Sequence, residues 1–326
     1  MAREAVWISG LTASYRDAEE ALERLARIHI SRSSIWLRVQ SWGARFQEIE
    51  HAARERTLAL PEHWQPPSRQ QVPDQRLGVA MDGFMVHLRE EGWKELKVGV
   101  VYDVGVRLAK NPETGEQEPQ AQAVNPTYTA YLGGPERFGE MVYTEARRRG
   151  WEQAQDRQTI GDGAAWIWNL VDEHFPDSVQ TLDWYHATEH LTEAAKLLKG
   201  ENTPAMQRWL NSRKTALYQG HADQISCELE QAAAEKGGEV GALLKREAGY
   251  FWEHQHRMGY LELREEEWPI GSGMAESGGE RFQARLVGPG MRWSRDGVEN
   301  LIPVRAAVLS ERFDAMWKLA YTSPPK

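Results

Sequence analysis

Residues 161–186 read GDGAAWIWNLVDEHFPDSVQTLDWYH, and this stretch decides the fold that the sequence predicts. An apolar approach ends at Asp162 between two glycines, a helix-length aromatic segment follows, and a second short apolar run ends at Asp183. Two strands joined by one helix form a parallel βαβ unit. Ligands and metals collect at the carboxyl ends of such strands. Two carboxylates at this sheet edge favour a metal-dependent enzyme over a pure binding module.

Three strands are expected before this unit, because turn-rich stretches separate three apolar runs: 77–81, 96–102 and 128–132. The first run ends at Asp82-Gly83, and residues 84–88 either continue that strand or return along it. A helical pattern at 135–149 then leads to the strand of the βαβ unit. Three strands, helix, strand, helix, strand is the order of an RNase H-like core. We therefore predict an α/β fold with an RNase H-like mixed sheet, a large all-helical insertion and a small helical N-terminal segment.

Proline marks the clearest boundary between domains. Pro61, Pro66, Pro67 and Pro73 lie in one polar stretch, which is typical of an extended linker. The expected organisation is a helical, helix-turn-helix-like segment (1–57), a proline-rich linker (58–76), the first part of the catalytic core (77–186), a helical insertion (187–268) and the C-terminal core helices (269–326).

Composition bounds the class of protein. The chain has 326 residues and a mean hydropathy of −0.64, and no apolar run reaches membrane-spanning length, so no membrane partner is expected. Cys227 is the only cysteine, which excludes an intrachain disulfide and a cysteine zinc cluster. The N-terminus lacks the pattern of a secretion signal. A cytoplasmic, nucleoid-associated location is the expectation.

The pattern of residues 15–43 predicts two helices with a short break between them, and Ser31 is a fitting N-cap for the second helix. The second helix is amphipathic, with Ile35, Trp36, Val39 and Trp42 on its apolar side and Ser33, Ser34, Arg38 and Gln40 on its polar side. A helix, a short turn and a basic second helix form a helix-turn-helix pattern of the DNA-binding kind. An ordinary helical hairpin fits equally well.

The charge of the chain gives mixed evidence on whether it binds nucleic acid. The formal net charge of −9 argues against such a partner, because phosphate binding needs Lys and Arg. Local charge matters more than the sum, however. The stretches 32–45 and 281–295 contain arginines and no acidic residue. Trp293, in the second stretch, is expected to pack rather than to stack on a base. The candidate DNA-binding residues are Arg32, Arg38, Arg281, Arg285, Arg292 and Arg295.

Three carboxylates are candidate catalytic and metal-binding residues: Asp82, Asp162 and Glu276. Asp82 ends the first predicted strand, Asp162 ends the fourth, and Glu276 lies in the first turns of a late helix. In an RNase H-like sheet these elements are neighbours, and three oxygen ligands there would hold two Mg²⁺ or Mn²⁺ ions about 3.5–4 Å apart. Each residue alone has a simpler explanation: a hairpin turn at Asp82-Gly83, a turn or helix cap at Asp162, and a solvated helix residue at Glu276.

Asp183 and His186 are a further pair, three residues apart. They could share a metal, or they could form a structural hydrogen bond near the end of the sheet. In the last helical region, Ser272 could cap a helix that Gly278 and Gly279 weaken by about 1 kcal/mol each relative to alanine. Pro303 is expected to interrupt the final helix.

Several segments together resemble the DDE transposases of the ISKra group of bacterial insertion sequences and, more broadly, Mutator-like transposases. The resemblance extends from about Asp82 to Trp317, with a weaker match at 15–43. The segments are Gly161–Asn169, Leu182–His190, Arg257–Tyr260, Ile270–Gly273 with Glu276-Ser277, and Gly290–Ser294.

The resemblance implies an RNase H-like core interrupted by a helical insertion, with the catalytic triad at Asp82, Asp162 and Glu276. Asp183 and His186 match the additional pair of the Mutator-like enzymes. It implies metal-dependent DNA cleavage and strand transfer at the ends of an insertion sequence. The partners would be terminal inverted repeats, target DNA and further copies of the chain, since two element ends must be brought together.

Two other functions compete with this prediction. Family members usually carry a longer N-terminal DNA-binding region, so the chain could be a truncated or domesticated copy that binds DNA without cutting it. An RNase H-like nuclease or resolvase that acts on structured nucleic acid is compatible with the same fold.

Overall fold

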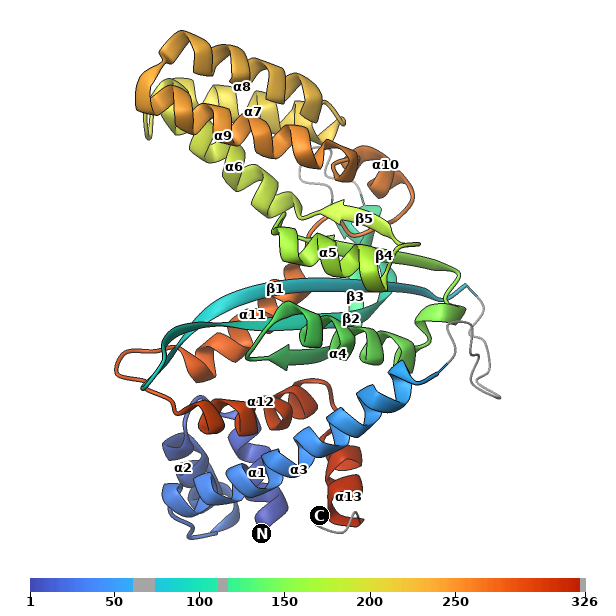
Figure 1. Cartoon of the computed structure of the whole chain (residues 1–326), viewed down its shortest axis with the longest axis vertical. Coiled ribbons are helices and arrows are strands. Elements are labelled where there is room, and N and C mark those ends of the chain that lie inside the picture. Colours follow the sequence, from blue (N-terminus) through green and yellow to red (C-terminus); the bar gives the residue numbers. More distant parts are fainter. Residues whose placement is uncertain (61–73, 111–116, 323–326) are drawn as a thin grey trace.

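The computed structural model describes residues 1–60, 74–110 and 117–322. Figure 1 shows three parts along the long axis: a helical bundle that contains both chain ends, a sheet flanked by helices, and a protruding group of helices. Most of the predicted proline-rich linker, residues 61–73, lies outside the described residues, as do residues 111–116. Within the described residues, no helix combines the length and apolar character needed to cross a membrane.

The sheet has five strands in the order β3-β2-β1-β4-β5. β2 runs antiparallel to both β1 and β3, while β4 is parallel to β1 and β5 is parallel to β4. The predicted α/β class, with a mixed sheet, is confirmed, as is the order of three strands, helix, strand, helix, strand. The strands are β1 (Arg76–Leu88), β2 (Gly92–Lys110), β3 (Gln117–Tyr131), β4 (Asp156–Gly161) and β5 (Val179–Leu182).

Asp82 does not end the first strand, as the sequence suggested, and Asp82-Gly83 is not a hairpin turn. β1 continues through both residues, and Gly83 pairs with Lys97 of β2. The strand continues because Phe84, Val86 and Leu88 alternate into the core beyond the Asp-Gly pair. The turn falls instead just before Gly92, whose φ of +71° suits glycine.

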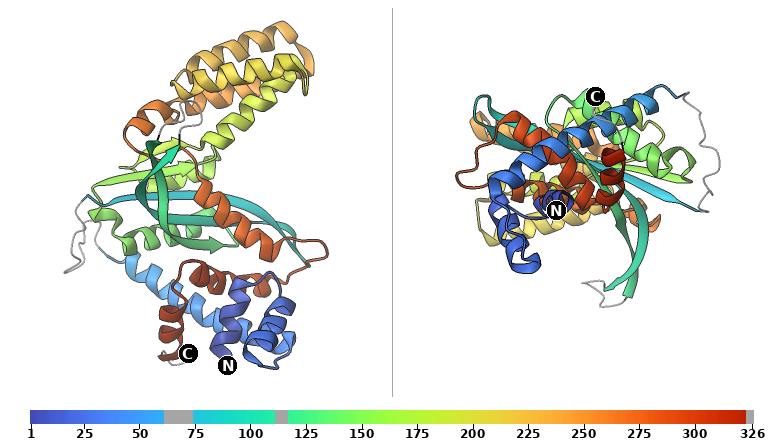
Figure 2. Two further views of the ribbon diagram at one scale, coloured as in Figure 1. Left: turned by 180° about the vertical axis from the view of Figure 1, so that it is seen from behind. Right: turned by 90° about the horizontal axis from the view of Figure 1, so that it is seen from below.

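Helices cover both faces of the sheet (Figures 1 and 2). Alternate residues of β1 point to opposite faces: Leu77 and Val79 pack on the side of α4 and α5, and Ala80 and Phe84 pack on the side of α11 and α12. The flanking helices are α4 (Pro135–Arg149), α5 (Ala165–His174), α11 (Gly273–Leu286) and α12 (Arg295–Leu309).

The helical bundle combines the N-terminal and C-terminal helices. Ser31 caps α3 as predicted. α3 continues past residue 43, where the second helix was expected to end, as far as Leu58, and α1 was not predicted as a separate helix. α3 crosses α12 at Gly43, where an added Cβ would lie 1.8 Å from the carbonyl oxygen of Asn300. The predicted segments 1–57 and 269–326 are thus packed together. The remaining helices of the bundle are α1 (Ala2–Leu11), α2 (Tyr15–Ala26), α3 (Arg32–Leu58) and α13 (Phe313–Thr322).

Pro303 does not interrupt the last helical region. It lies inside α12, which continues to Leu309. A proline has no N–H, so the carbonyl of Glu299, four residues earlier, loses its helical partner. The side-chain amide of Gln47 in α3 donates to that carbonyl at 3.0 Å. The neighbouring helix therefore satisfies the group that proline leaves without a donor.

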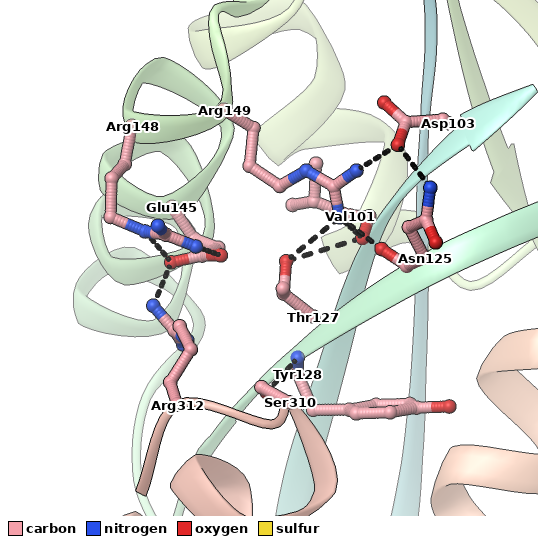
Figure 3. A network of polar contacts seen from close by, with 10 residues as sticks. All are labelled: Val101, Asp103, Asn125, Thr127, Tyr128, Glu145, Arg148, Arg149, Ser310 and Arg312. Atoms are coloured by element: carbon pink, nitrogen blue, oxygen red, sulfur yellow. Dashed lines mark hydrogen bonds and ion pairs between the residues drawn. The ribbon is translucent and has the colours of Figure 1, made fainter. Parts of the chain in front are cut away.

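Polar contacts join the bundle to the sheet layer (Figure 3). Glu145 of α4 is buried and accepts hydrogen bonds from Arg148 of the same helix and from Arg312, between α12 and α13. Burial opposes ionisation of Glu145, yet these two arginines hold its pKa below the ordinary value. Ser310, at the end of α12, accepts a hydrogen bond from the backbone N–H of Tyr128 in β3 at 2.8 Å.

The region 187–268 is helical, as predicted. α6 leaves the sheet edge, α7 and α8 form the distant end, and α9 returns toward the sheet (Figure 1). The short helix α10 then leads to α11. These helices are α6 (Trp184–Lys199), α7 (Pro204–Tyr218), α8 (Ala222–Lys236), α9 (Gly238–His254) and α10 (Tyr260–Glu265).

Replacing Gly43 with alanine is expected to lower the free energy of unfolding by about 1–3 kcal/mol, because the added methyl group would overlap the α12 backbone. Gly249→Ala in α9 is the matched control. Gly249 is exposed with nothing within 4 Å of its Cβ position, so the change should raise stability by about 0.5–1 kcal/mol. Urea denaturation measures both changes, and equal shifts would contradict the close crossing of α3 and α12.

Candidate active site

Three aspartates lie in a row at one edge of the sheet. β1 pairs with β4 up to Ala80 and Ile160, and two further steps along each strand reach Asp82 and Asp162. β4 pairs with β5 up to Gly161 and Leu182, and one further step reaches Asp162 and Asp183. The backbone N–H of Asp183 donates to the carbonyl of Gly161 at 2.8 Å, which continues the ladder. The register therefore places Asp82, within β1, beside Asp162 and Asp183, which directly follow the carboxyl ends of β4 and β5.

The carboxyl of Asp82 interacts with the other acidic groups. Burial raises its pKa above the ordinary value, the hydrogen bond from the N–H of Gly83 opposes that rise, and the charges of Asp162 and Asp183 add to it. His186 acts in the opposite direction. The negative charge of Asp82 is thus costly in this position unless a cation lies nearby.

Asp162 lies in the turn between β4 and α5. One carboxylate oxygen, Oδ1, accepts a hydrogen bond from the N–H of Ala164 at 2.8 Å. The next residue, Gly163, has a φ of +101°, which favours glycine. The turn that was an alternative explanation for Asp162 is therefore present, and it directs the carboxylate at the sheet edge.

Asp183 has a structural role. It is 1% exposed, and its Oδ1 accepts hydrogen bonds from the backbone N–H groups of Tyr185, at 2.7 Å, and His186, at 3.0 Å. Its Oδ2 accepts another from the N–H of Ser272. Of the two alternatives for Asp183 and His186, the structural hydrogen bond is present, but its donor is the backbone N–H of His186 because the carboxylate caps α6. Nδ1 of the His186 ring lies 3.5 Å from Oε2 of Glu189.

α11 approaches the sheet through its glycines. An added Cβ at Gly278 would lie 2.4 Å from the ring of Tyr128, and one at Gly279 would lie 3.4 Å from Oδ2 of Asp82. The glycines that were expected only to weaken this helix permit the close contact. Ser272 occupies the N-cap position, but its side chain makes no capping hydrogen bond, contrary to expectation; its N–H is bound to Asp183.

Glu276 lies in the first turn of α11, as predicted, although its side chain lies outside what the structure describes. Residues three apart share a face of a helix. Position 276 therefore lies one turn before Gly279, on the face that meets Asp82. The backbone brings all three members of the predicted triad to one region.

The chemistry of these residues fits a hard divalent cation. Carboxylate oxygens are the ligands that Mg²⁺ and Mn²⁺ prefer. In the described part of the chain, the salt bridges include no lysine or arginine bound to Asp82 or Asp162. Among side chains that the structure describes, which leave out Glu276, no group of three or more His, Cys, Asp or Glu residues is arranged to hold a metal ion. The two aspartates supply part of a ligand set to which Glu276 would add.

Two residues of the helical insertion that were not candidate site residues also lie at or next to the site. The Tyr250 hydroxyl, from the far end of α9, donates to the backbone carbonyl of Asp162 at 3.0 Å. His190 of α6 stacks on the Tyr250 ring with centroids 3.6 Å apart. The sequence held no signal for this contact, because the two helices and the Asp162 turn are far apart along the chain.

The candidate DNA-binding arginines have different surroundings. Arg285 is 2% exposed and packs between Tyr15 and Trp293, so it is not available to a phosphate at the surface. Arg295 is bound to Glu91 and Glu299. The remaining four are exposed or half-buried: Arg32, Arg38, Arg281 and Arg292.

A groove unites the two basic stretches that the sequence singled out. Its cavity volume is about 360 Å³, and its lining includes Trp36 of α3, Arg89 after β1 and Arg292 before α12. Trp36 is 40% exposed, although it was expected on the apolar side of its helix. Trp293 packs as predicted, with its ring N–H donating to the carbonyl of Leu286 at 3.0 Å. Arg89 was missed because it lies outside both stretches.

Comparison with known proteins does not identify the chain. No protein-family model matches it, and no curated protein matches it.

Replacing Asp82 with asparagine is expected to stabilise the metal-free protein at pH 7 by about 0.5–2 kcal/mol, the usual range for a stabilising substitution. Burial and the neighbouring carboxylates raise the pKa of Asp82 above 3.8, so the folded wild type holds this proton more tightly than the unfolded chain. The stability that Asp82 contributes is complete below pH 3.8 and is lost as pH rises through the raised value.

Urea denaturation at several pH values measures this difference between Asp82→Asn and wild type. The advantage of the variant should be present at pH 7 and should shrink toward pH 4. The exposed Asp177→Asn is the control and should change little. A variant that is less stable than wild type at pH 7 would contradict the repulsive carboxylate edge.

Proposed function

We propose that the chain is a DDE-type DNA transposase, which cuts and joins DNA at the ends of an insertion sequence with the help of divalent metal ions. The observation that carries this proposal is the alignment of Asp82 with Asp162 at one sheet edge, together with position 276 on the face of α11 that meets Asp82. Three carboxylates, from β1, the turn after β4 and α11, are the ligand set that such enzymes need.

The arrangement of the sheet supports an RNase H-like core. The strand order β3-β2-β1-β4-β5, with β2 alone antiparallel to the others, is the arrangement of that fold. The helical insertion follows β5 directly, and α11 then returns to the face of the sheet. This position of the insertion agrees with the resemblance to insertion-sequence transposases.

Asp82, Asp162 and Glu276 would hold two Mg²⁺ or Mn²⁺ ions. When bound, such ions activate the attacking hydroxyl and stabilise the leaving oxygen of a phosphodiester. Asp183 orients the site, since it ties the start of α6 to the start of α11. His186 lies close enough to Asp82 to favour its ionised form. The N-terminus of α6 adds partial positive charge at the same edge.

The groove between Trp36, Arg89 and Arg292 would bind the DNA backbone. Arg89 and Arg292 are exposed. Nε of Arg89 donates to the backbone carbonyl of Arg292 at 3.1 Å and so links the end of β1 to this loop. A basic groove with an exposed tryptophan suits a phosphate backbone with an accessible base. Since the chain as a whole carries a net charge of −9, DNA would be attracted to this groove and not to the rest of the surface.

Metal titration combined with a nicking assay tests the chemistry. Wild type should bind Mn²⁺ and nick DNA that carries the element ends, while Asp162→Asn should lose metal affinity. Glu276→Gln should reduce nicking by at least about 100-fold and leave DNA binding unchanged. Asp177→Asn is the control and should match wild type.

The outcome also separates the competing functions. DNA binding without metal binding or nicking would favour a non-cutting regulator. Cleavage of structured nucleic acid, with no dependence on terminal repeats, would favour a nuclease or resolvase. Full cleavage by Glu276→Gln would overturn the assignment of the triad.

Charge reversal tests the groove. Arg292→Glu is expected to weaken DNA binding and to reduce the slope of log affinity against log salt by about 1, because one phosphate contact is lost. Arg208→Glu, at an exposed position in the helical insertion, is the matched control for net charge. Fluorescence anisotropy at several salt concentrations measures both. Equal losses for the two variants would show that only total charge matters.

A further inference from the structure

The helical insertion returns to the candidate active site at one residue, Tyr250 of α9. Its hydroxyl donates to the backbone carbonyl of Asp162, 88 positions earlier in the chain, at 3.0 Å. Its ring covers the next residue, Gly163, where an added Cβ would lie 2.9 Å from Cε2 of the tyrosine. Tyr250 therefore contacts both the polar and the apolar side of the turn that carries the Asp162 carboxylate.

The turn at Asp162 determines where its carboxylate points. Oδ1 accepts from the N–H of Ala164, two residues later, so the side chain and the backbone of the turn move together. Gly163 adopts a left-handed φ of +101°, a conformation with few restraints of its own. A hydrogen bond to the carbonyl of Asp162 and a ring against Gly163 would hold this turn in one arrangement.

Tyr250 is itself held on the opposite side. His190 of α6 stacks on its ring with centroids 3.6 Å apart and planes 19° apart. Nδ1 of His190 lies 2.5 Å from Oε2 of Glu247, which is 1% exposed and also bound by Arg246. Glu247 and Tyr250 are one turn apart on α9, so the cluster joins α6 to α9. The two helices of the insertion nearest the sheet are therefore linked to the Asp162 turn.

We propose that Tyr250 is a positioning residue for Asp162, and that His190 and Glu247 hold it in place so that the helical insertion sets the metal-binding geometry. The inference rests on the proposed function, because Asp162 is there assigned as a metal ligand. Tyr250 touches the backbone of the ligand residue, and it acts through Asp162.

Tyr250→Phe removes the hydroxyl and keeps the ring that fills the space above Gly163. Tyr260→Phe is the matched control, because Tyr260 lies buried in the same helical region and its hydroxyl has no hydrogen-bond partner among the described residues. Mn²⁺ affinity is measured from the electron paramagnetic resonance signal of free Mn²⁺, with no DNA present. Thermal unfolding in EDTA reports the stability of each variant separately.

Tyr250→Phe is expected to weaken Mn²⁺ affinity about 10-fold or more, the effect of losing a group that orients a metal ligand. Tyr260→Phe should bind Mn²⁺ as wild type does, and both variants should unfold at temperatures close to each other. His190→Phe, which retains a ring against Tyr250 but loses the contact with Glu247, should weaken Mn²⁺ binding to a smaller extent.

The outcomes separate this inference from the proposed function. Wild type that binds Mn²⁺, together with Tyr250→Phe that binds it equally well, would overturn the positioning role alone. Equal weakening by Tyr250→Phe and Tyr260→Phe would also overturn it, since the hydrogen bond to Asp162 would then not matter. Wild type that binds no Mn²⁺ would overturn the proposed function and this inference with it.

Discussion

The rest of the site depends on the hydrogen bonds that the carboxylate of Asp183 accepts. It is buried at the end of β5 and accepts hydrogen bonds from Tyr185 and His186 at the start of α6 and from Ser272 before α11. A buried carboxylate without such donors would be costly, and here backbone N–H groups satisfy both of its oxygens. One side chain thus joins the sheet edge, the first helix of the insertion and the helix that carries Glu276.

The approach of α11 to the sheet depends on small residues. Gly278 lies against Tyr128, and Gly279 lies against the carboxylate of Asp82. Glycine weakens an isolated helix, but it permits a helix axis to lie closer to a strand than any side chain would allow. Tyr128 is in turn held by Ser310 of the terminal bundle. The position of Glu276 therefore depends on packing that extends from the sheet to the C-terminal helices.

The sequence predicted the strand and helix order, the helical insertion and the neighbourhood of Asp82 and Asp162, because these follow from apolar periodicity and parallel connections. It missed α1, whose buried face consists of Ala5, Val6, Ser9 and Gly10 and gives little apolar signal. It misplaced Asp82, since strand pairing outweighed the turn preference of Asp-Gly. Burial of Arg285 and the contact of Tyr250 with Asp162 depend on tertiary packing, which charge counts and local spacing do not report.

The treatment of charge at Asp82 differs from that of acidic groups that arginine binds directly. Glu145, Glu228 and Glu91 are each bound by arginine, which holds their pKa values below the ordinary range. At Asp82, in contrast, burial and the charges of Asp162 and Asp183 raise the pKa. A fold that places carboxylates together without an arginine partner gives up stability at that edge. Such an arrangement supports the proposed metal site at Asp82 and Asp162.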